Sequence, residues 1–293
     1  APLCWRSSTG EVHASQYDPR GEEWLRGFYG GLMVTCGLTT AGWPSVDQGH
    51  EVPLHGRAAY LQARNVQVDG DWDGDDYVMW VQGRVRETVV YGEDVRLTRR
   101  VWARLGESRL FIDDLVENLG HAPVPHMIAY HVNPGFPVLD EGSEFVSSAR
   151  ETEGIRPEWN RLIPRHTRME GPTPSWEYYV FHHRLGADAD GFAHTALVNR
   201  RLPLGLYIKH RPEQLPWMWQ WKQMGQGTYV MGMEPANCRG DGRALARERG
   251  ELRELAPGER QQYNLEIGVL HTAEQVDALE RAAGSARGGQ QPG

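Results

Sequence analysis

The sequence predicts an all-β protein, an antiparallel β-sandwich with little helix. Three observations lead to this expectation. Short runs of strand-forming residues recur between turn-forming segments, and helical periodicity is confined to the C-terminal end of the chain. Aromatic residues account for 10% of the sequence, including 11 Trp, a density that disordered chains lack. Short strands separated by turns at regular intervals are typical of antiparallel sandwiches.

The first group of expected strands covers residues 77–81, 96–105 and 110–112, which are rich in aliphatic and aromatic side chains. The segments 91–94 and 105–108 that separate them contain Gly together with Glu, Asp or Ser, which favour turns. Short turns between strands indicate antiparallel pairing.

A second group of strands is expected in the C-terminal half, at residues 194–199, 205–209, 229–234 and 262–270. The last of these alternates cleanly between apolar and polar side chains. Its apolar residues share one face because strand side chains alternate with period two. They are Tyr263, Leu265, Ile267 and Val269.

One helix is expected near the C-terminus. Thr272 and Gln275 have capping-box spacing, and Val276 and Leu279 follow at helical spacing. Beyond this helix, residues 284–293 are polar and Gly-rich, so we expect a mobile tail.

We expect a single domain over residues 1–293, because the sequence shows no internal repeat and strands of the same character lie on both sides of segment 151–176. That segment is rich in Pro and Glu, and we expect a long loop there. Long loops inside compact domains tend to line functional sites.

Composition argues against several classes of partner. The formal net charge is −8, and Arg residues are interleaved with Glu and Asp, so no nucleic-acid partner is expected. The apolar runs are too short for a membrane span, and no signal peptide is visible. Cys4, Cys36 and Cys238 are widely spaced and odd in number, which argues against a disulfide framework or structural zinc and favours a cytoplasmic location.

The segment 229–237 carries the most informative carboxylate. In a strand over residues 229–234, Val230, Gly232 and Glu234 share one face, and the other face is apolar. Gly232 leaves open space beside Glu234, and Pro235 is expected to end the strand. A carboxylate among apolar neighbours tends to have a perturbed pKa, which suits a general base. The alternative is an ordinary strand-end Glu that binds a loop amide or an Arg.

Two histidines have comparable settings. His55 lies between Leu54 and Gly56, and a Gly next to a His permits the close backbone approach that ligand sites often need. His131 ends an apolar strand and enters a loop rich in Gly and Pro, where functional groups often gather. Each could instead be a structural His with satisfied hydrogen bonds.

A set of short motifs occurs in order between about residues 30 and 270. They are Leu54-His55-Gly56-Arg57, Val116-Glu117-Asn118 followed by Pro125-His126, Tyr130-His131-Val132-Asn133-Pro134-Gly135-Phe136-Pro137, Leu215-Pro216, Gln220-Trp221-Lys222, Gly232-Met233-Glu234-Pro235-Ala236-Asn237 and Gly242-Arg243. In these motifs the chain resembles the galactose mutarotase-like superfamily, and within it an uncharacterised branch related to aldose 1-epimerases.

The resemblance implies an antiparallel β-supersandwich with an open, concave sugar cleft. It assigns Glu234 as the general base on the anomeric hydroxyl and His131 as the general acid on the ring oxygen. It assigns His55 as a hydrogen-bonding group near the ring oxygen and the anomeric carbon. Ring opening needs one proton removed and one delivered, and each such group contributes about 10²–10⁴-fold. No cofactor or metal is required.

The chain departs from the family pattern at positions that could contact substrate. Arg57 stands where the family has Gly, and a guanidinium there would suit a carboxylate or phosphate on the sugar. Its alternative is a salt bridge to Asp47 or Glu51. Lys222 could bind a sugar oxygen, or its stem could pack on the neighbouring Trp rings with its head in solvent. The remaining expected substrate-binding residues are His182, Asn133 and Trp221.

Three functional hypotheses follow. The first is an aldose 1-epimerase acting on a monosaccharide, which the Arg57 pattern suggests could be acidic. The second is another sugar isomerisation, epimerisation or elimination in the same cleft, with a metal held by His55, His131 and Glu234. The third is a carbohydrate-binding module without catalysis, which would not need a buried Glu facing two His. A homodimer is left open.

Overall fold

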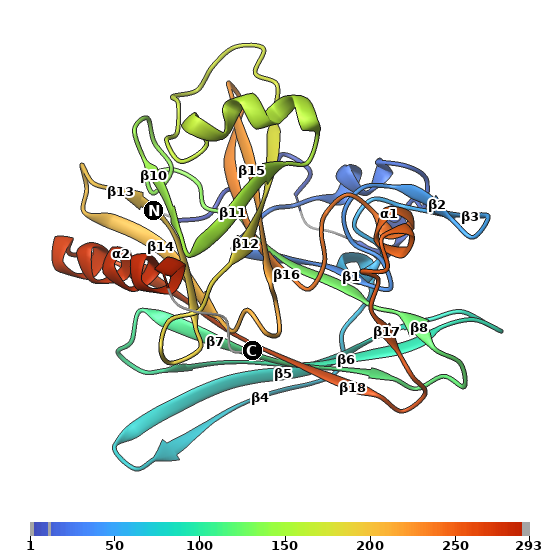
Figure 1. Cartoon of the computed structure of the whole chain (residues 1–293). Coiled ribbons are helices and arrows are strands. Elements are labelled where there is room, and N and C mark those ends of the chain that lie inside the picture. The colour runs from blue at the N-terminus through green and yellow to red at the C-terminus, as the bar shows by residue number, and fades with distance from the viewer. Residues whose placement is uncertain (1–2, 11–12, 289–293) are drawn as a thin grey trace.

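Two antiparallel sheets packed face to face make up most of the molecule (Figure 1). The computed structural model describes residues 3–10 and 13–288. One sheet has six strands in the order β1-β9-β16-β15-β12-β11, and the other has eight in the order β10-β13-β14-β18-β7-β6-β5-β4. The antiparallel sandwich predicted from the sequence is confirmed.

The six-stranded sheet carries the candidate site. Its strands are β1 (Met33–Leu38), β9 (Met127–Val132), β16 (Thr228–Ala236), β15 (Trp217–Gly225), β12 (Tyr179–Leu185) and β11 (Ala149–Gly154).

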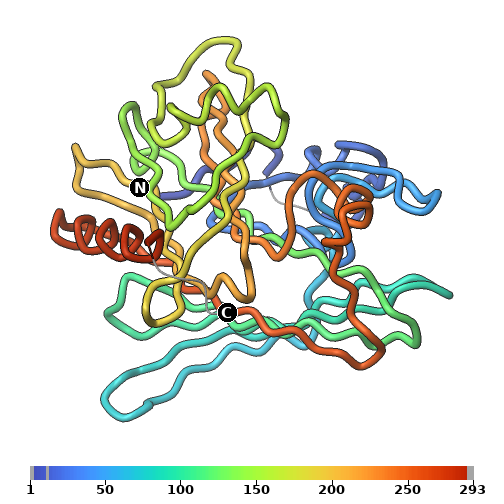
Figure 2. The backbone as a smooth tube through the Cα atoms, in the orientation of Figure 1, coloured from blue at the N-terminus to red at the C-terminus, as the bar shows by residue number. Residues whose placement is uncertain are grey.

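The eight-stranded sheet includes the strands that the sequence predicted most clearly. Its members are β10 (Glu144–Ser147), β13 (Ala193–Asn199), β14 (Leu204–His210), β18 (Arg260–Leu270), β7 (Arg109–Asn118), β6 (Asp94–Arg104), β5 (Asp76–Thr88) and β4 (Arg64–Asp73). The β4–β5 hairpin, at the lower left of Figure 2, extends beyond the neighbouring strands.

Short elements complete the fold. Two small sheets pair β2 (Ser45–Asp47) with β3 (His50–Val52) and β8 (Val124–Pro125) with β17 (Glu254–Leu255). The helices are η1 (Ala14–Gln16), η2 (Glu23–Gly27), η3 (Ala58–Tyr60), η4 (Pro157–Arg165), α1 (Arg243–Glu248) and α2 (Ala273–Gly288). None of the helices within residues 3–10 and 13–288 is long and apolar enough to cross a membrane.

The main core fills the space between the two large sheets. Tyr130 and Val132 from β9 pack there with Met231 and Met233 from β16. The alternate residues of the same strands face outward, where Ala129 belongs to a second apolar cluster. The six-stranded sheet therefore packs against the main core on its inner face. Its outer face packs against the second cluster and carries the candidate site.

The C-terminal helix begins as the sequence predicted. Oγ1 of Thr272 accepts a hydrogen bond from the backbone N–H of Gln275 at 3.2 Å, while Oε1 of Gln275 accepts from the N–H of His271 at 2.9 Å. The mobile tail predicted from residue 284 is wrong for residues 284–288, because α2 continues to Gly288. Residues 289–293 lie outside the described part of the chain.

Two other boundaries also differ from the predictions. β16 does not end at Pro235 but runs on to Ala236. A residue without an N–H is tolerated because β9 pairs with β16 only at Met233 and Ala236 in this region. The predicted long loop over residues 151–176 contains the end of β11 and the helix η4. Cys4, Cys36 and Cys238 are free thiols, as expected.

Candidate active site

A cavity of about 240 Å³ lies on the outer face of the six-stranded sheet. The strands β9, β16, β15 and β12 supply its floor, and the segment that contains η2 covers it. Aromatic rings dominate the lining: Trp24, Phe28, Trp43, Tyr178, Trp219 and Trp221. Its residues also include His55, His131 and Glu234, so the three predicted catalytic side chains converge on one site.

The pairing of β9 with β16 brings His131 and Glu234 together. Val132 and Met233 are register partners on these strands and face the core, which places the preceding His131 and the following Glu234 on the opposite face. Nε2 of His131 lies 3.2 Å from Oε1 of Glu234, and both residues are 3% exposed. The two groups are within ion-pair distance of each other.

Gly232 makes this contact possible. A Cβ at this position would collide with Oε1 of Glu234, and it would lie 3.0 Å from Cβ of Trp221 and 3.1 Å from Cε1 of His131. The sequence predicted open space beside Glu234 at this glycine. The structure shows that the carboxyl group of Glu234 itself and the imidazole of His131 fill that space.

Burial controls the protonation of the pair. It raises the pKa of Glu234 well above its ordinary value. It also lowers the pKa of His131 well below its ordinary value, with a further lowering by His55 and an opposing effect of Asn133. Both directions disfavour separated charges, because an apolar cavity solvates ions poorly. Burial thus favours the uncharged form of each group.

Asn133 supports His131 and does not line the cavity. Nδ2 of Asn133 donates to the backbone carbonyl of His131 at 2.8 Å. Oδ1 of Asn133 and Nδ1 of His131 are both buried without a well-formed hydrogen bond, and the amide acts on the imidazole by raising its pKa. The side chain is fully buried, and the predicted contact of Asn133 with substrate stays a prediction that its position does not favour.

His55 enters the cavity from the loop between β3 and η3. Its φ of 56° is in the left-handed region, and Gly56 follows at 70°. Nδ1 of His55 accepts a hydrogen bond from the N–H of Gly42 at 3.3 Å. Burial lowers the pKa of His55 to about 3, so the ring is neutral and carries its proton on Nε2. His55 can thus donate one hydrogen bond into the cavity.

The aromatic rings fix the orientation of the two imidazoles. The ring of His55 lies 4.7 Å from that of Trp24 and stacks on Trp219 at 6.2 Å, measured between centroids. The ring of His131 lies 4.9 Å from Phe28 and 5.5 Å from Trp221. Trp221 therefore lines the site, in agreement with the sequence prediction, and its contact with substrate remains a prediction.

Lys222 faces away from the cavity, a position that does not favour its predicted role in substrate binding. It follows Trp221 on β15, and adjacent residues of a strand face opposite sides. Its Nζ donates to the carbonyl oxygens of Arg165 at 3.1 Å and Arg168 at 2.6 Å, and it pairs with Glu170 at 2.7 Å. Lys222 anchors the segment after η4.

His182 lies behind the cavity wall. It is fully buried, and its Nε2 accepts a hydrogen bond from the N–H of Gly240 at 3.0 Å. Its Nδ1 lies 3.8 Å from Oε1 of Glu153. Gly240 lines the cavity and His182 does not, so the position of His182 does not favour its predicted contact with substrate. The side chain shapes the wall by holding Gly240.

Arg57 is not among the residues that line the cavity, and its contact with substrate stays a prediction. Its guanidinium lies 5.9 Å from the ring centroid of Tyr17 and interacts electrostatically with Glu87. The alternative salt bridges to Asp47 or Glu51 are also absent from the ion pairs between described residues, because Asp47 pairs with two arginines of α1.

Several lining residues were not found from the sequence. Trp24 and Phe28 come from η2 and the residue after it, where the sequence shows no strand and no motif. Trp43 and Tyr178 come from loops. The high Trp content was the one available signal, but it gives no position.

Within the described part of the chain, no group of three or more His, Cys, Asp and Glu side chains has an arrangement that could hold a metal ion. The group formed by His55, His131 and Glu234 is therefore not such a metal site.

Comparison with known proteins places the fold. The family described as "Domain of unknown function (DUF4432)" matches residues 1–269. A candidate aldose 1-epimerase from Klebsiella pneumoniae subsp. pneumoniae MGH 78578 superposes with a TM-score of 0.92 at 27% identity, over 98% of this chain and 76% of that one. No curated protein matches the sequence.

Two more distant structures share the architecture. A galactose mutarotase-like protein from Clostridium acetobutylicum gives a TM-score of 0.58 at 13% identity, over 83% of this chain and 80% of that one. A galactose mutarotase related enzyme from Lactobacillus acidophilus gives 0.57 at 14% identity, over 84% and 85%. The fold is that of the galactose mutarotase-like proteins, as the sequence motifs indicated.

Proposed function

The chain belongs to the DUF4432 family, and we propose that it is a carbohydrate-active enzyme, an aldose 1-epimerase that interconverts the anomers of a monosaccharide. The observation that carries the proposal is the contact of 3.2 Å between Nε2 of His131 and Oε1 of Glu234. This pair lies in a cavity lined by aromatic rings. The name of the Klebsiella protein supports the same activity.

The pair can supply both proton transfers that the reaction needs. Anomer exchange requires removal of the proton on the anomeric hydroxyl and delivery of a proton to the ring oxygen. In the form with a proton on His131 and none on Glu234, Glu234 is the base and His131 is the acid, although burial disfavours this charged form relative to the neutral pair. The ring C–O bond then breaks and leaves an open-chain aldehyde. After rotation about the bond between C1 and C2, the same two transfers run in reverse and close the ring on the other face.

The substrate must replace the direct contact between the two groups. At 3.2 Å, no sugar atom can lie between Nε2 and Oε1, so the sugar approaches from the cavity side. Its anomeric hydroxyl then donates to Glu234, and its ring oxygen accepts from His131. The N–H at Nε2 of His55 supplies a further donor for an oxygen that gains charge during the reaction. Preorganised donors of this kind contribute substantially to rate.

The shape and charge of the cavity indicate the size and type of sugar. A volume of about 240 Å³ is small for a ligand pocket, since pockets for drug-sized ligands measure about 300–1,000 Å³. The flat rings of Trp219 and Trp221 can stack on the apolar face of a pyranose. The described lining residues include Glu22 and Glu234 but no Lys or Arg, so we propose a monosaccharide without an acidic group.

The buried carboxyl group favours an enzyme over a binding module. Burial of an ionisable group costs free energy unless it is neutralised or paired. A module that only binds sugar would gain more from a neutral amide at position 234. The placement of Glu234 against His131, in a site that raises the pKa of one group and lowers that of the other, is typical of acid–base catalysis.

The direct test is anomer exchange of freshly dissolved aldoses, followed by polarimetry and NMR across a panel of hexoses and pentoses. Glu234→Gln keeps the shape of the side chain and removes the base, so kcat should fall by about 10²–10⁴-fold with little change in KM. His131→Asn should have a similar effect. Glu266→Gln is the matched control, because Glu266 lies on β18 in the other sheet. The proposal fails if wild-type protein accelerates no aldose, or if all three variants behave alike.

A further inference from the structure

His55 is held in an unusual backbone conformation by one short segment of chain, residues 37–42. The carbonyl of His55 accepts from the N–H of Gly37 at 2.9 Å, and its own N–H donates to the carbonyl of Gly42 at 2.9 Å. Its Nδ1 also accepts from the N–H of Gly42. Non-Gly residues rarely adopt a positive φ, so these three bonds at the two ends of the segment keep the imidazole in the cavity.

Gly56, the residue after His55, packs closely against the same segment, residues 37–42. A Cβ on Gly56 would lie 2.5 Å from the carbonyl oxygen of Thr40 and 2.6 Å from that of Gly37. Such distances are too short for any side chain, so only Gly fits. The position of the imidazole is therefore set by the position of residues 37–42, and a displacement of this segment would displace His55.

Glu87 anchors this segment from the opposite sheet. It lies near the end of β5 and is 2% exposed. Its Oε2 accepts from the backbone N–H of Leu38 at 2.7 Å, and its Oε1 accepts from Oγ1 of Thr39 at 2.9 Å. The guanidinium of Arg57 interacts favourably with the same carboxylate. One side chain thus holds two consecutive residues of the segment.

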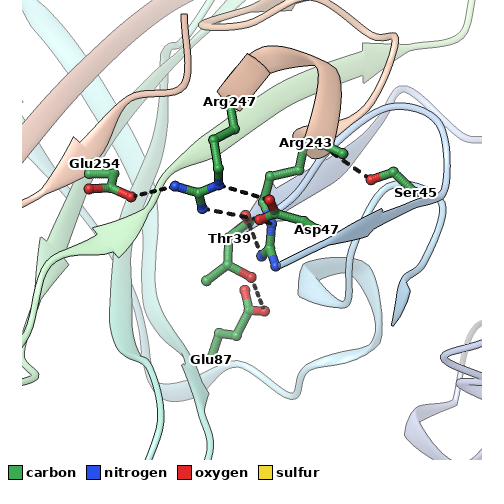
Figure 3. Close-up of polar contacts among 8 residues, drawn as sticks. Thr39, Ser45, Asp47, Glu87, Arg243, Arg247 and Glu254 are labelled. Atoms are coloured by element: carbon green, nitrogen blue, oxygen red, sulfur yellow. Dashed lines mark hydrogen bonds and ion pairs between the residues drawn. The ribbon is translucent and has the colours of Figure 1, made fainter. Parts of the chain in front are cut away.

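A second anchor acts on Thr39 through its carbonyl oxygen. Nη1 of Arg243 donates to that oxygen at 3.3 Å, and Nε of Arg243 donates to Asp47 at 2.8 Å. Arg247 also binds Asp47, through Nε at 2.8 Å. Figure 3 shows both anchors meeting at Thr39, with Glu87 on its hydroxyl and the Asp47–arginine cluster on its other side.

We propose that Glu87 is a positioning residue for His55, acting through the hydrogen bonds it accepts from Leu38 and Thr39. Glu87 does not line the cavity, so it cannot contact the substrate. A buried carboxylate costs free energy, and a neutral residue would pack between the sheets more cheaply. The hydrogen bonds that Glu87 accepts from Leu38 and Thr39 account for a carboxyl group at this buried position. The expected loss of activity rests on the proposed function, whereas the expected displacement of the His55 imidazole does not.

The kinetic test compares two substitutions of Glu87. Glu87→Leu removes both acceptors and leaves the N–H of Leu38 unpaired. Displacement of a catalytic group by about 1 Å can cost about 10²-fold, so kcat/KM should fall by about that factor. Glu87→Gln should retain most of the activity, because its carbonyl can accept from Leu38 while its amide donates to the hydroxyl of Thr39. Equal activity of the two variants would overturn the proposal.

A matched control separates positioning from loss of stability. Glu117 on β7 is a similarly buried carboxylate, 4% exposed, and its partners are Arg96 and Arg260 instead of residues 37–42. Glu117→Leu should destabilise the fold and leave kcat/KM of the folded protein unchanged. A loss of activity as large as that of Glu87→Leu would show that any buried charge in this sheet has the same effect.

A double-mutant cycle tests whether Glu87 acts through His55. His55→Asn removes the imidazole, and Asn tolerates a positive φ better than most residues. If positioning of His55 is the whole effect, adding Glu87→Leu to His55→Asn should cost less than about 3-fold. A further loss of about 10²-fold would mean that Glu87 acts elsewhere.

A spectroscopic readout tests the same point without any substrate. In protein labelled with ¹⁵N-histidine, Nδ1 of His55 reports the hydrogen bond from Gly42. Glu87→Leu should shift this signal, and Glu117→Leu should not. Should Glu87→Leu fail to fold, Thr39→Val removes one of the two anchoring bonds more mildly and should also shift it. An unchanged signal would overturn the proposal, even if the wild-type protein catalyses no anomer exchange.

Discussion

Gly232 and Glu234 share one face of β16, and the carboxyl group of Glu234 lies where a side chain at position 232 would be. The geometry of the candidate catalytic pair, His131 and Glu234, therefore depends on the absence of a Cβ atom at position 232. The same small space holds Cε1 of His131, so an added methyl group would disturb both members of the pair.

Gly232→Ala should accordingly impair catalysis although it changes no ionisable group. The new Cβ would push Oε1 of Glu234 away from Nε2 of His131, and kcat should fall by about 10²-fold, as for other small displacements of catalytic groups. Overpacking should also lower the free energy of unfolding by about 1–3 kcal/mol. Kinetics of anomer exchange and urea unfolding measure the two effects.

The control for this substitution is Gly284→Ala. Gly284 lies in α2 with no atom within 4 Å of an added Cβ. Because Ala is a better helix former than Gly, this variant should gain up to about 1 kcal/mol and keep full activity. An active Gly232→Ala protein would show that the carboxyl group can move without loss, and the close contact would then have no catalytic meaning.

Stability should fall as the pH is lowered below about 6.5, because several histidines are buried in the neutral form. Burial lowers the pKa of His55 to about 3 and those of His126 and His210 to about 4, from an ordinary value of 6.5. Between these limits the unfolded chain binds protons that the folded protein does not, so acid favours unfolding. Glu234 has the opposite sign, since its raised pKa favours the folded state at low pH.

Thermal melts between pH 8 and pH 4 measure this effect. His210 lies away from the cavity, and its Nε2 contacts the carbonyl of Leu215 at 3.2 Å, a bond that a Gln amide can replace. His210→Gln should therefore reduce the loss of stability between pH 6.5 and pH 4. A melting temperature that is constant over this interval in the wild-type protein would contradict the assignment of neutral buried imidazoles.

The three converging side chains could be predicted because each has a local signal. Glu234 ends an alternating segment beside a glycine, and His55 and His131 occur in motifs that resemble those of known sugar enzymes. The resemblance implied that they share one cleft. The pairing of β9 with β16 and the left-handed turn at His55, on which their convergence depends, were not predicted from the sequence.

The predicted site residues that lie outside the cavity have a common physical explanation. Asn133 and Lys222 lie next to residues of the site in sequence but point to the opposite side of the strand or behind it, and sequence proximity does not reveal direction. For Lys222, recognition of residues 217–225 as a strand would have placed it opposite Trp221. The covering rings of Trp24 and Phe28 reach the site only through tertiary packing, which no local pattern records.

Lys222→Met should affect stability and leave the chemistry intact. Two carbonyl oxygens would lose the ammonium donor, and Glu170 would lose its partner. Hydrogen bonds to charged groups contribute about 1.5–3 kcal/mol, so the free energy of unfolding should drop by about that amount. KM for sugars should not change. Lys209→Met, whose ammonium lies over the ring of Phe192, is the control and should cost less than about 1 kcal/mol. A rise in KM for sugars in Lys222→Met but not in Lys209→Met would show that Lys222 contributes to substrate binding.

Arg57→Ala should not discriminate between acidic and neutral sugars. The guanidinium lies against Tyr17 and near Glu87 instead of in the cavity, so no charge-assisted bond to a substrate carboxylate or phosphate is lost. Any decrease in kcat/KM should be shared equally by a hexose, the matching uronic acid and the 6-phosphate, since it would arise from the weakened support of residues 37–42. Parallel kinetics on the three sugars measure this. A rise in KM confined to the acidic sugars would show that Arg57 reaches the substrate, and the site would then accept an anionic sugar.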